Sequence, residues 1–348
     1  IHHAGFPAEM NQILMVAKKY GLVVIEDNAQ APGATYRGQF TGTIGQIGVF
    51  SLNSSKIIQA GEGGIATTDD DKLAQRLRLI RNHGEKVVPE MDSQQSQNLL
   101  GFNLRMTEMT AAVARVQLER LDELKAWQIR LANHLTQRIR KEYDFIMAPD
   151  VPDDCTHVYS SYRMEFNAEA AGMSFALFTE AILAEGVPVR IGPPDVLYHQ
   201  PVYRNRSISD QSGFPFGKKW YDGYVTYDEG SCPQAESLVN NSLFIDKLMR
   251  YPISTEDMDR VLDAFAKVIM FKEDIVAWDE AGRPEEKPKF MPKVESSPKE
   301  EKRSMESEQP ELTEAEIVTP EQTSTVDYGE SVVIALGSEA YESAYTLA

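Results

Sequence analysis

The sequence AEMNQILMVAKKYGLVVIED, residues 8–27, sets the class of fold. Its first part repeats apolar side chains at helical spacing, and Gly21 then provides a stop signal. The apolar run at residues 22–25 is typical of a short buried parallel strand, and it ends in the charged pair Glu26-Asp27. Ligands of α/β proteins bind at the carboxyl ends of such strands. We therefore expect an α/β fold with a ligand site near Asp27.

Four further segments extend this pattern outward. The stretches QIGVFSL at residues 46–52 and GGIATT at residues 63–68 predict two more strands, separated by a polar, glycine-containing loop. Residues 69–81 predict a helix with an acidic first turn and a basic last turn. Residues 107–132 predict a long amphipathic helix, capped by Thr107, that bridges two domains.

The composition changes twice along the rest of the chain. We expect residues 1–132 to form a partial large domain with its bridging helix, and residues 133–275 to form a smaller α+β domain. In the smaller domain the pattern predicts strands at 157–166 and 187–192 and helices at 174–186 and 255–269. Residues 276–325 are rich in Glu, Lys, Pro and Ser, which predicts a disordered acidic tail and linker. Residues 326–348 begin with a strand-like apolar run followed by a helix-like pattern, and we leave this segment unassigned between a second module and an appendage.

The overall charge excludes several classes of function. The net charge is -18 over 348 residues, which argues against nucleic-acid binding because that needs clustered Lys and Arg. No apolar run reaches the roughly 20 residues that span a bilayer, and no signal-peptide pattern opens the chain. The two cysteines, Cys155 and Cys232, lack CxxC spacing, and the pair His2-His3 has no acidic residue at metal spacing. We expect a cytoplasmic protein with no membrane contact and no metal.

Lys56 is the candidate nucleophile. It lies five residues after Ser51 and shortly before the run Gly61-Glu62-Gly63-Gly64. A lysine that forms an imine must have its amine placed and partly desolvated, and a serine nearby could bind the phosphate of a cofactor. The alternative is an ordinary solvated lysine in a polar loop.

Asp27 and Gln30 are the candidate cofactor contacts on the preceding strand end. A carboxylate at Asp27 could pair with the nitrogen of a pyridine ring and keep it protonated, which makes the ring an electron sink. Gln30 could lie across the ring or donate to its phenolic oxygen. The alternatives are a helix cap or surface carboxylate for Asp27 and a turn-stabilising amide for Gln30.

Four blocks in order carry a resemblance to a known family: VIEDNAQAPGATYRG, VFSLNSSKIIQAGEGGIATTDD, RLRLIRNHGE and GFNLRMTEMTAAVARVQLERLDE. Together they resemble the DegT/StrS family of pyridoxal-phosphate-dependent sugar aminotransferases, over roughly residues 1–270. The resemblance implies a fold type I large domain, a smaller C-terminal domain and a homodimer with shared active sites. Family members carry a further N-terminal portion, so we expect an N-terminally truncated member.

The resemblance also implies roles for individual residues. Lys56 resembles the lysine that holds pyridoxal 5'-phosphate as an imine, Asp27 the partner of the ring nitrogen, Gln30 the ring contact and Ser51 a ligand of the phosphate. Asn103 is similar to the asparagine that reaches across the dimer interface to the partner's cofactor phosphate. Arg105 resembles a basic residue at that shared site, suited to the donor's carboxylate, although both could belong to a structural loop.

Three positions depart from the family pattern. Leu52 stands where an aromatic residue is usual, and Asn28 replaces a small residue. Tyr203, in a segment that resembles the family's substrate loop, lies where many members have histidine, and it is our candidate for substrate binding. His83 is expected to be a loop or helix-end histidine.

The expected activity is amino transfer from glutamate or glutamine to a keto sugar, nucleotide-linked in our leading hypothesis. A keto-cyclitol is the second candidate, which the aromatic stretch WYDGYVTYDEGSCPQAESL at residues 220–238 would suit by stacking. A truncated or regulatory relative without turnover is the non-enzymatic alternative. Relatives that dehydrate sugars have histidine in place of the lysine, so Lys56 argues against that chemistry.

Overall fold

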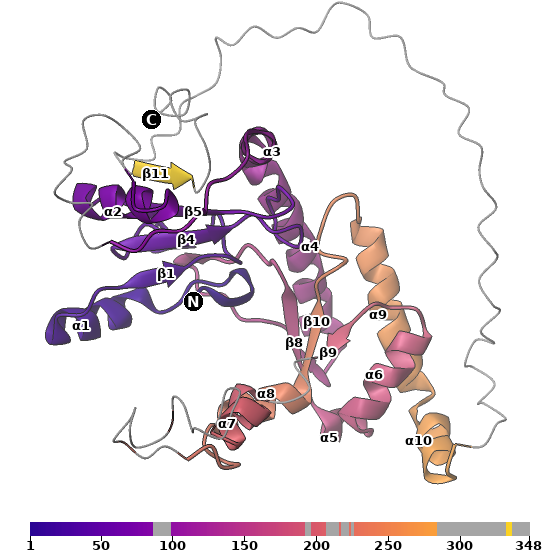
Figure 1. Ribbon diagram of the computed structural model, residues 1–348. Coiled ribbons are helices and arrows are strands. Elements are labelled where there is room, and N and C mark those ends of the chain that lie inside the picture. Colours follow the sequence, from indigo (N-terminus) through magenta and orange to yellow (C-terminus); the bar gives the residue numbers. More distant parts are fainter. Residues whose placement is uncertain are drawn as a thin grey trace, which may run out of the picture.

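The computed structural model has two lobes joined by a long helical connection (Figure 1). It describes residues 1–85, 99–191, 196–206, 216, 223 and 226–283, together with the backbone of residues 332–335. The expected linker beyond position 283, the rest of the C-terminal segment and part of the aromatic stretch 220–238 lie outside these described residues.

The first helix and strand form where the periodicity predicts them. Helix α1 (Met10–Tyr20) ends at Gly21, whose φ of 64° is the left-handed conformation that glycine adopts readily. Strand β1 (Ile25–Asp27) follows. The expectation that this run is buried is wrong: Val23 is 66% and Ile25 61% exposed. The reason is that β1 is an edge strand, and no described element covers the face that carries Ile25.

The sheet of the first lobe has the order β1-β4-β5-β11. Strand β4 (Ile47–Ser51) runs parallel to β1, and β5 (Gly64–Thr68) runs antiparallel to β4. Both strands lie where the sequence predicts them. Strand β11 (Val332–Ala335) pairs with β5. A separate small sheet contains β2 (Thr35–Tyr36), β3 (Gln39–Phe40) and β7 (Cys155–Thr156).

Two helices replace the single bridging helix expected at residues 107–132. Helix α3 (Glu108–Glu119) is capped by Thr107 as expected, and α4 (Leu121–Glu142) follows after a break at Arg120. The Arg120 N–H bonds to the carbonyl of Gln117 in the tight three-residue pattern that ends a helix, and α4 then continues ten residues past the expected end. The longer span is stabilised because α4 buries its apolar face in the second lobe. Before them, α2 (Asp71–Arg81) is capped by Asp70 and packs against β5 and β11.

The second lobe is a four-stranded sheet covered by helices (Figure 1). Its strand order is β6-β8-β10-β9, and its core includes Phe178 and Phe265. The strand expected at 157–166 begins later in the structure, at Tyr162, so residues 157–161 are not part of it. The strands are β6 (Ile146–Met147), β8 (Tyr162–Phe166), β9 (Arg190–Ile191) and β10 (Ser242–Ile245). The helices are α5 (Ala168–Ala171), α6 (Phe175–Ala184), α7 (Pro201–Arg204), α8 (Pro233–Asn241), α9 (Thr255–Met270) and α10 (Lys272–Glu280), with 3-10 turns η1 (His3–Gly5) and η3 (Leu197–His199).

The expected start of the disordered linker at residue 276 is too early. Helix α10 continues to Glu280, and Ile275 is fully buried in the core of the second lobe. That anchor holds the next turn of helix in place despite its polar composition. Among the described residues, no helix is long and apolar enough to cross a membrane.

Candidate active site

Asp27 and Ser51 end two neighbouring parallel strands. Asp27 is paired with Val49 in the register of β1 and β4, and Ser51 lies two residues beyond Val49. Paired residues, and residues two apart along one strand, share a face of the sheet, so Asp27 and Ser51 lie on the same face at the same edge. This face is exposed at Val49. The Asp27 carboxylate accepts one hydrogen bond, of 3.1 Å, from the N–H of Ala29 and is otherwise exposed.

The loop that carries Lys56 is held by its own backbone. The N–H of Leu52 bonds to the carbonyl of Gly63 at 2.9 Å, and the N–H of Ser54 bonds to that of Gly61 at 2.8 Å. Leu52, the residue that departs from the family's aromatic, is fully buried and packs with Ile58 and Met106. The loop is therefore a closed structure anchored in a small apolar cluster.

Gly63 suits the end of this loop. Its φ is 149°, a backbone conformation that other residues adopt only with strain. A Cβ atom added there would lie 2.9 Å from the Met106 Cε, the flexible end of that side chain, so the backbone conformation is the main reason for glycine.

The Lys56 side chain is half-buried on this loop. Its backbone N–H bonds to the carbonyl of Asn53 at 2.9 Å, and the Asn53 side chain binds Ser55 on one side and Glu62 on the other. Within the part of the chain that the structure describes, the Lys56 amine has no hydrogen-bond or ion-pair partner. A placed amine without a partner is available to a carbonyl group.

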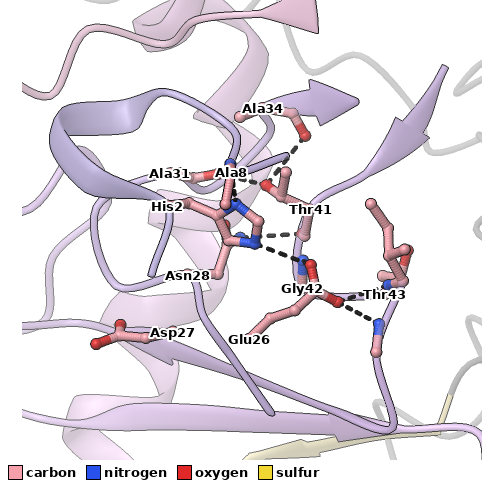
Figure 2. A network of polar contacts seen from close by, with 12 residues as sticks. His2, Ala8, Glu26, Asp27, Asn28, Ala31, Ala34, Thr41, Gly42 and Thr43 are labelled. Atoms are coloured by element: carbon pink, nitrogen blue, oxygen red, sulfur yellow. Dashed lines mark hydrogen bonds and ion pairs between the residues drawn. The ribbon is translucent and has the colours of Figure 1, made fainter. Parts of the chain in front are cut away.

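Glu26, the neighbour of Asp27, is the centre of a buried network (Figure 2). Its Oε2 accepts hydrogen bonds from the Nε2 of His2 at 2.9 Å and from the N–H of Gly42 at 2.8 Å. Its Oε1 accepts from the N–H groups of Ile44 and Gly45, both at 2.6 Å. Figure 2 shows Asp27 pointing away from this network, as alternation along a strand requires.

These bonds bear on the His2 ring and on the pKa of Glu26. The His2 Nδ1 accepts from the N–H of Ala8 at 3.0 Å, which leaves Nε2 as the donor to Glu26. Burial alone would raise the pKa of the Glu26 carboxyl, but the hydrogen bonds from His2 and three backbone N–H groups outweigh it and lower that pKa. Our sequence reasoning missed both residues, although the alternation of Glu26 and Asp27 was a usable signal.

Gln30 lies close to the same segment. Its Oε1 accepts a hydrogen bond of 2.6 Å from the N–H of Ala4 in η1. The side-chain carbonyl therefore ties the start of the chain to the turn after β1.

Asn103 and Arg105 form a second group with His83. The Arg105 Nε donates to the Asn103 Oδ1 at 3.0 Å, and its Nη2 lies 3.5 Å from the Nε2 of His83. A bridge between Asn82 and Asn103 holds the strand-like segment against the end of α2. All three side chains are exposed, and none has a described contact with Lys56 or Asp27. His83 is a helix-end histidine as expected.

Tyr203 lies elsewhere. It is part of α7 and contacts Tyr227 and Phe216, at centroid distances of 5.4 and 6.3 Å. Figure 1 places α7 beside α8 and well away from the loop between β4 and β5. The structure does not bring Tyr203 to Lys56 within this chain.

Arg250 contacts the loop that carries Lys56, and sequence reasoning missed this contact. Its Nη2 donates to the carbonyl of Ser55 at 3.4 Å. Ser55 directly precedes Lys56 and lies 195 positions before Arg250 in the sequence. The segment around it is fastened to the bridging helix, since Trp127 donates to the carbonyl of Ile253 at 2.8 Å and Gln128 to that of Met249 at 2.7 Å. No local pattern could have predicted this contact between the lobes.

Comparison with known proteins identifies the family of the chain. The model of the DegT/DnrJ/EryC1/StrS aminotransferase family matches residues 1–228. The chain belongs to this family. Among curated relatives, GDP-perosamine synthase of Caulobacter vibrioides is 40% identical over 166 residues, which are 47% of this chain and 43% of that protein. L-glutamine:scyllo-inosose aminotransferase of Streptomyces griseus is 34% identical over 192 residues, 53% of this chain and 45% of that protein. The chain spans about half the length of these relatives.

Solved structures confirm the expected fold class. An aminotransferase from Psychrobacter cryohalolentis aligns with a TM-score of 0.64 and 27% identity over 77% of this chain and 67% of that one. DesV of S. venezuelae, solved in complex with a ketimine intermediate, aligns with a TM-score of 0.62 and 26% identity over 77% and 63%. The chain therefore has the fold type I architecture of pyridoxal-phosphate aminotransferases.

Proposed function

We propose that this chain carries the catalytic lysine of an aminotransferase that moves an amino group from glutamate or glutamine to a nucleotide-linked keto sugar. The observation that carries the proposal is the Lys56 amine, half-buried and without a described partner, on a closed loop beside the strand ends that hold Asp27 and Ser51. The names of the relatives, a perosamine synthase and a UDP-sugar 3-aminotransferase among them, support the class of substrate.

The residues fit pyridoxal 5'-phosphate. Asp27 offers an exposed carboxylate to the ring nitrogen, and Ser51 offers a hydroxyl to the phosphate from the same face of the sheet. Gly64, paired with Ser51, leaves the adjacent place on that face free of a side chain. When bound, the cofactor supplies an electron sink for the α-carbon of the amino donor. Gln30 is the further ring contact in this proposal.

The protein's own groups then have distinct tasks. Lys56 would hold the cofactor covalently and, when released from it, its amine would accept the proton from the α-carbon of the amino donor. Asp27 would pair with the ring nitrogen. Arg105 and Tyr203 would contribute to substrate binding in this proposal.

We also propose a homodimer, in which Asn103 and Arg105 serve the partner's site. An exposed apolar surface surrounds them: Phe102 and Leu104 lie beside them in sequence, and α3 has no buried residue. Four large side chains of α3 are at least half exposed, namely Met109, Val113, Val116 and Leu118. An apolar surface of this kind marks a protein interface. The two cysteines of the chain, Cys155 and Cys232, are both unpaired, which fits the cytoplasm.

A keto-cyclitol is the second candidate substrate, because the S. griseus relative is named for scyllo-inosose. Assays with a panel of nucleotide-linked keto sugars and keto-cyclitols distinguish the two. Turnover of only cyclitols would overturn the sugar assignment.

The proposal is tested on the natural full-length protein, loaded with pyridoxal phosphate. We expect a visible absorption band that borohydride abolishes, and peptide mapping should find the reduced cofactor on Lys56. Lys56→Ala should lose the band and turnover, whereas Lys72→Ala, a change of an exposed lysine on α2, should keep both. A reduced cofactor on another lysine would overturn the site, and the absence of any band would favour the regulatory alternative.

A further inference from the structure

The turn formed by residues 2–5 is fastened to the end of β1, beside the candidate site. The N–H of His2 donates to the carbonyl of Asp27 at 3.0 Å, and the His2 ring is held in the buried network around Glu26 (Figure 2). The two residues that follow in η1 have positive φ, Ala4 at 57° and Gly5 at 96°. Such conformations are uncommon and persist only where the surrounding structure holds them.

The other side of this turn lies on the segment that leads into β8 of the second lobe. The carbonyl of Gly5 accepts from the N–H of Val158 at 3.0 Å, and that of Ala4 accepts from the N–H of Ser161 at 3.3 Å. The two backbones are so close that a Cβ atom on Gly5 would lie 2.9 Å from the backbone nitrogen of Tyr159. A side chain could enter this space only if one of the two backbone segments moved. The turn is therefore held from both sides.

This turn also fixes the side chain of Gln30. The N–H of Ala4 donates to the Gln30 Oε1 at 2.6 Å. Because a backbone N–H can only donate, the amide atom that faces it must be the oxygen, and the two ends of the amide cannot be exchanged. Gln30 is half-buried, and within the part of the chain that the structure describes its Nε2 has no hydrogen-bond partner. The NH₂ group is therefore the end of the amide that is left for a ligand.

We propose that Gly5 is a positioning residue: the turn at residues 2–5, held between β1 and residues 158–161, orients Gln30 so that its NH₂ group, and not its carbonyl, is offered to the cofactor. This inference rests on the proposed function and adds to it the part of the chain that orients one of its residues. A group that is held in one orientation before binding loses less freedom when it binds. Because the same turn contacts residues 158–161, the orientation of Gln30 depends on the segment that leads into the second lobe as well as on β1.

Gly5→Ala tests this role, with Gly21→Ala as the matched control. Both glycines have positive φ, but a Cβ atom on Gly21 would meet nothing within 4 Å. In the full-length protein both variants should lose thermal stability, because alanine is strained at positive φ. Only Gly5→Ala should also weaken the binding of pyridoxal phosphate, by about tenfold, because the displaced turn no longer orients Gln30. Equal affinities of the two variants for pyridoxal phosphate would overturn the proposal.

Variants of Gln30 test the hydrogen bond to Ala4 without a change in the backbone. Gln30→Glu keeps an acceptor for the Ala4 N–H but has no NH₂ group to donate, and Gln30→Leu has neither. In the cofactor-free full-length protein, NMR with nitrogen-labelled alanine should show the Ala4 amide exchanging about tenfold faster in Gln30→Leu and at the wild-type rate in Gln30→Glu. Both variants should bind pyridoxal phosphate about tenfold more weakly than the wild type.

The outcomes separate this inference from the proposed function. Unchanged exchange of the Ala4 amide in Gln30→Leu, or wild-type affinity for pyridoxal phosphate in Gln30→Glu, would overturn the inference alone. A wild-type protein that binds no pyridoxal phosphate would overturn the proposed function and the task of Gln30 together. Exchange of the Ala4 amide is measured without the cofactor, so the two failures are distinguishable.

Discussion

Two adjacent carboxylates on one strand have opposite environments. Glu26 is buried with four hydrogen-bond donors, whereas Asp27 is exposed with one. Alternation along β1 produces this difference, because neighbouring side chains point to opposite faces. We expect one carboxylate to serve the stability of the fold and the other to serve chemistry.

Asp27→Asn should slow amino transfer while the fold remains intact. An amide has no charge to keep the ring nitrogen protonated, and the loss of such an interaction raises the barrier by about 3–4 kcal/mol, a slowing of about a hundredfold to a thousandfold. Single-turnover rates with the amino donor, together with the thermal midpoint, measure both effects in the full-length enzyme. A near-normal rate would mean that Asp27 only holds the turn at Ala29.

Glu26→Gln should leave a fold of lower stability. The amide presents its NH₂ group to N–H donors in a buried site, and breaking a buried charged network costs about 3 kcal/mol of unfolding free energy. Urea unfolding at pH 7 measures the loss. Asp27→Asn is the matched control and should change stability by less than about 0.5 kcal/mol.

The stability that Glu26 contributes depends on pH, and the direction of this dependence follows from its pKa. The folded pKa of Glu26 lies below the ordinary value of 4.5, so the unfolded chain binds the proton more readily. The stabilisation is therefore fully present above about pH 4.5 and is lost as the pH falls through the folded pKa. The difference between the wild type and Glu26→Gln should narrow below pH 4.5, and a constant difference would contradict an ionised, hydrogen-bonded Glu26.

At the scale of elements, α9 begins with a reciprocal cap. The Ser254 hydroxyl accepts from the N–H of Asp257 at 3.3 Å, and the Asp257 Oδ2 accepts from the N–H of Ser254 at 2.9 Å. This capping box fixes the start of a helix that packs on the bridging helix α4 and buries Leu262 and Phe265. The position at which α9 starts therefore affects the packing of α9 on α4.

Ser254→Ala should lower the free energy of unfolding by about 1 kcal/mol, because two N–H groups at the helix start lose or weaken their partners. Thr255→Ala, one residue on, makes no cap and should cost less than about 0.5 kcal/mol. A double variant with Asp257→Ala should lose less than the sum of the single losses, as coupled partners do. Additive losses in urea unfolding would show that the two side chains act independently.

At the scale of the whole molecule, the exposed group of Asn103 and Arg105 gives the proposed dimer a testable geometry. A two-fold interface presents the same surface twice, so a side chain that crosses it must be matched by its symmetry mate. Each site would then combine Lys56 of one subunit with Asn103 of the other.

Mixing inactive Lys56→Ala subunits with inactive Asn103→Ala subunits of the full-length enzyme should restore activity. One site in each mixed dimer would carry both intact residues, so a fully exchanged equal mixture should regain roughly a quarter of wild-type activity if subunits pair at random. Subunit exchange is checked by native mass spectrometry with one isotope-labelled variant. No recovery after confirmed exchange would place Asn103 in the site of its own subunit.

Local sequence was sufficient to place several of the elements and to put Asp27 at the end of a strand. Helical spacing, the stop at Gly21, the charged ends of residues 69–81 and the cap Thr107 predicted the positions of α1, α2 and the start of α3, because these signals act within one turn of helix. The end of an apolar strand predicted the place of Asp27, since the strand and the residue that ends it are contiguous.

Contacts between distant parts of the chain were accessible only in the folded molecule. The burial of Glu26 depends on N–H groups that a later turn supplies, and Arg250 reaches Ser55 across 195 positions. The docking of β11 on β5 likewise joins segments that no local pattern relates. Periodicity and caps reflect how a segment forms hydrogen bonds within its own backbone. The long-range contacts depend instead on which surfaces and polar groups remain uncovered when the segments pack together.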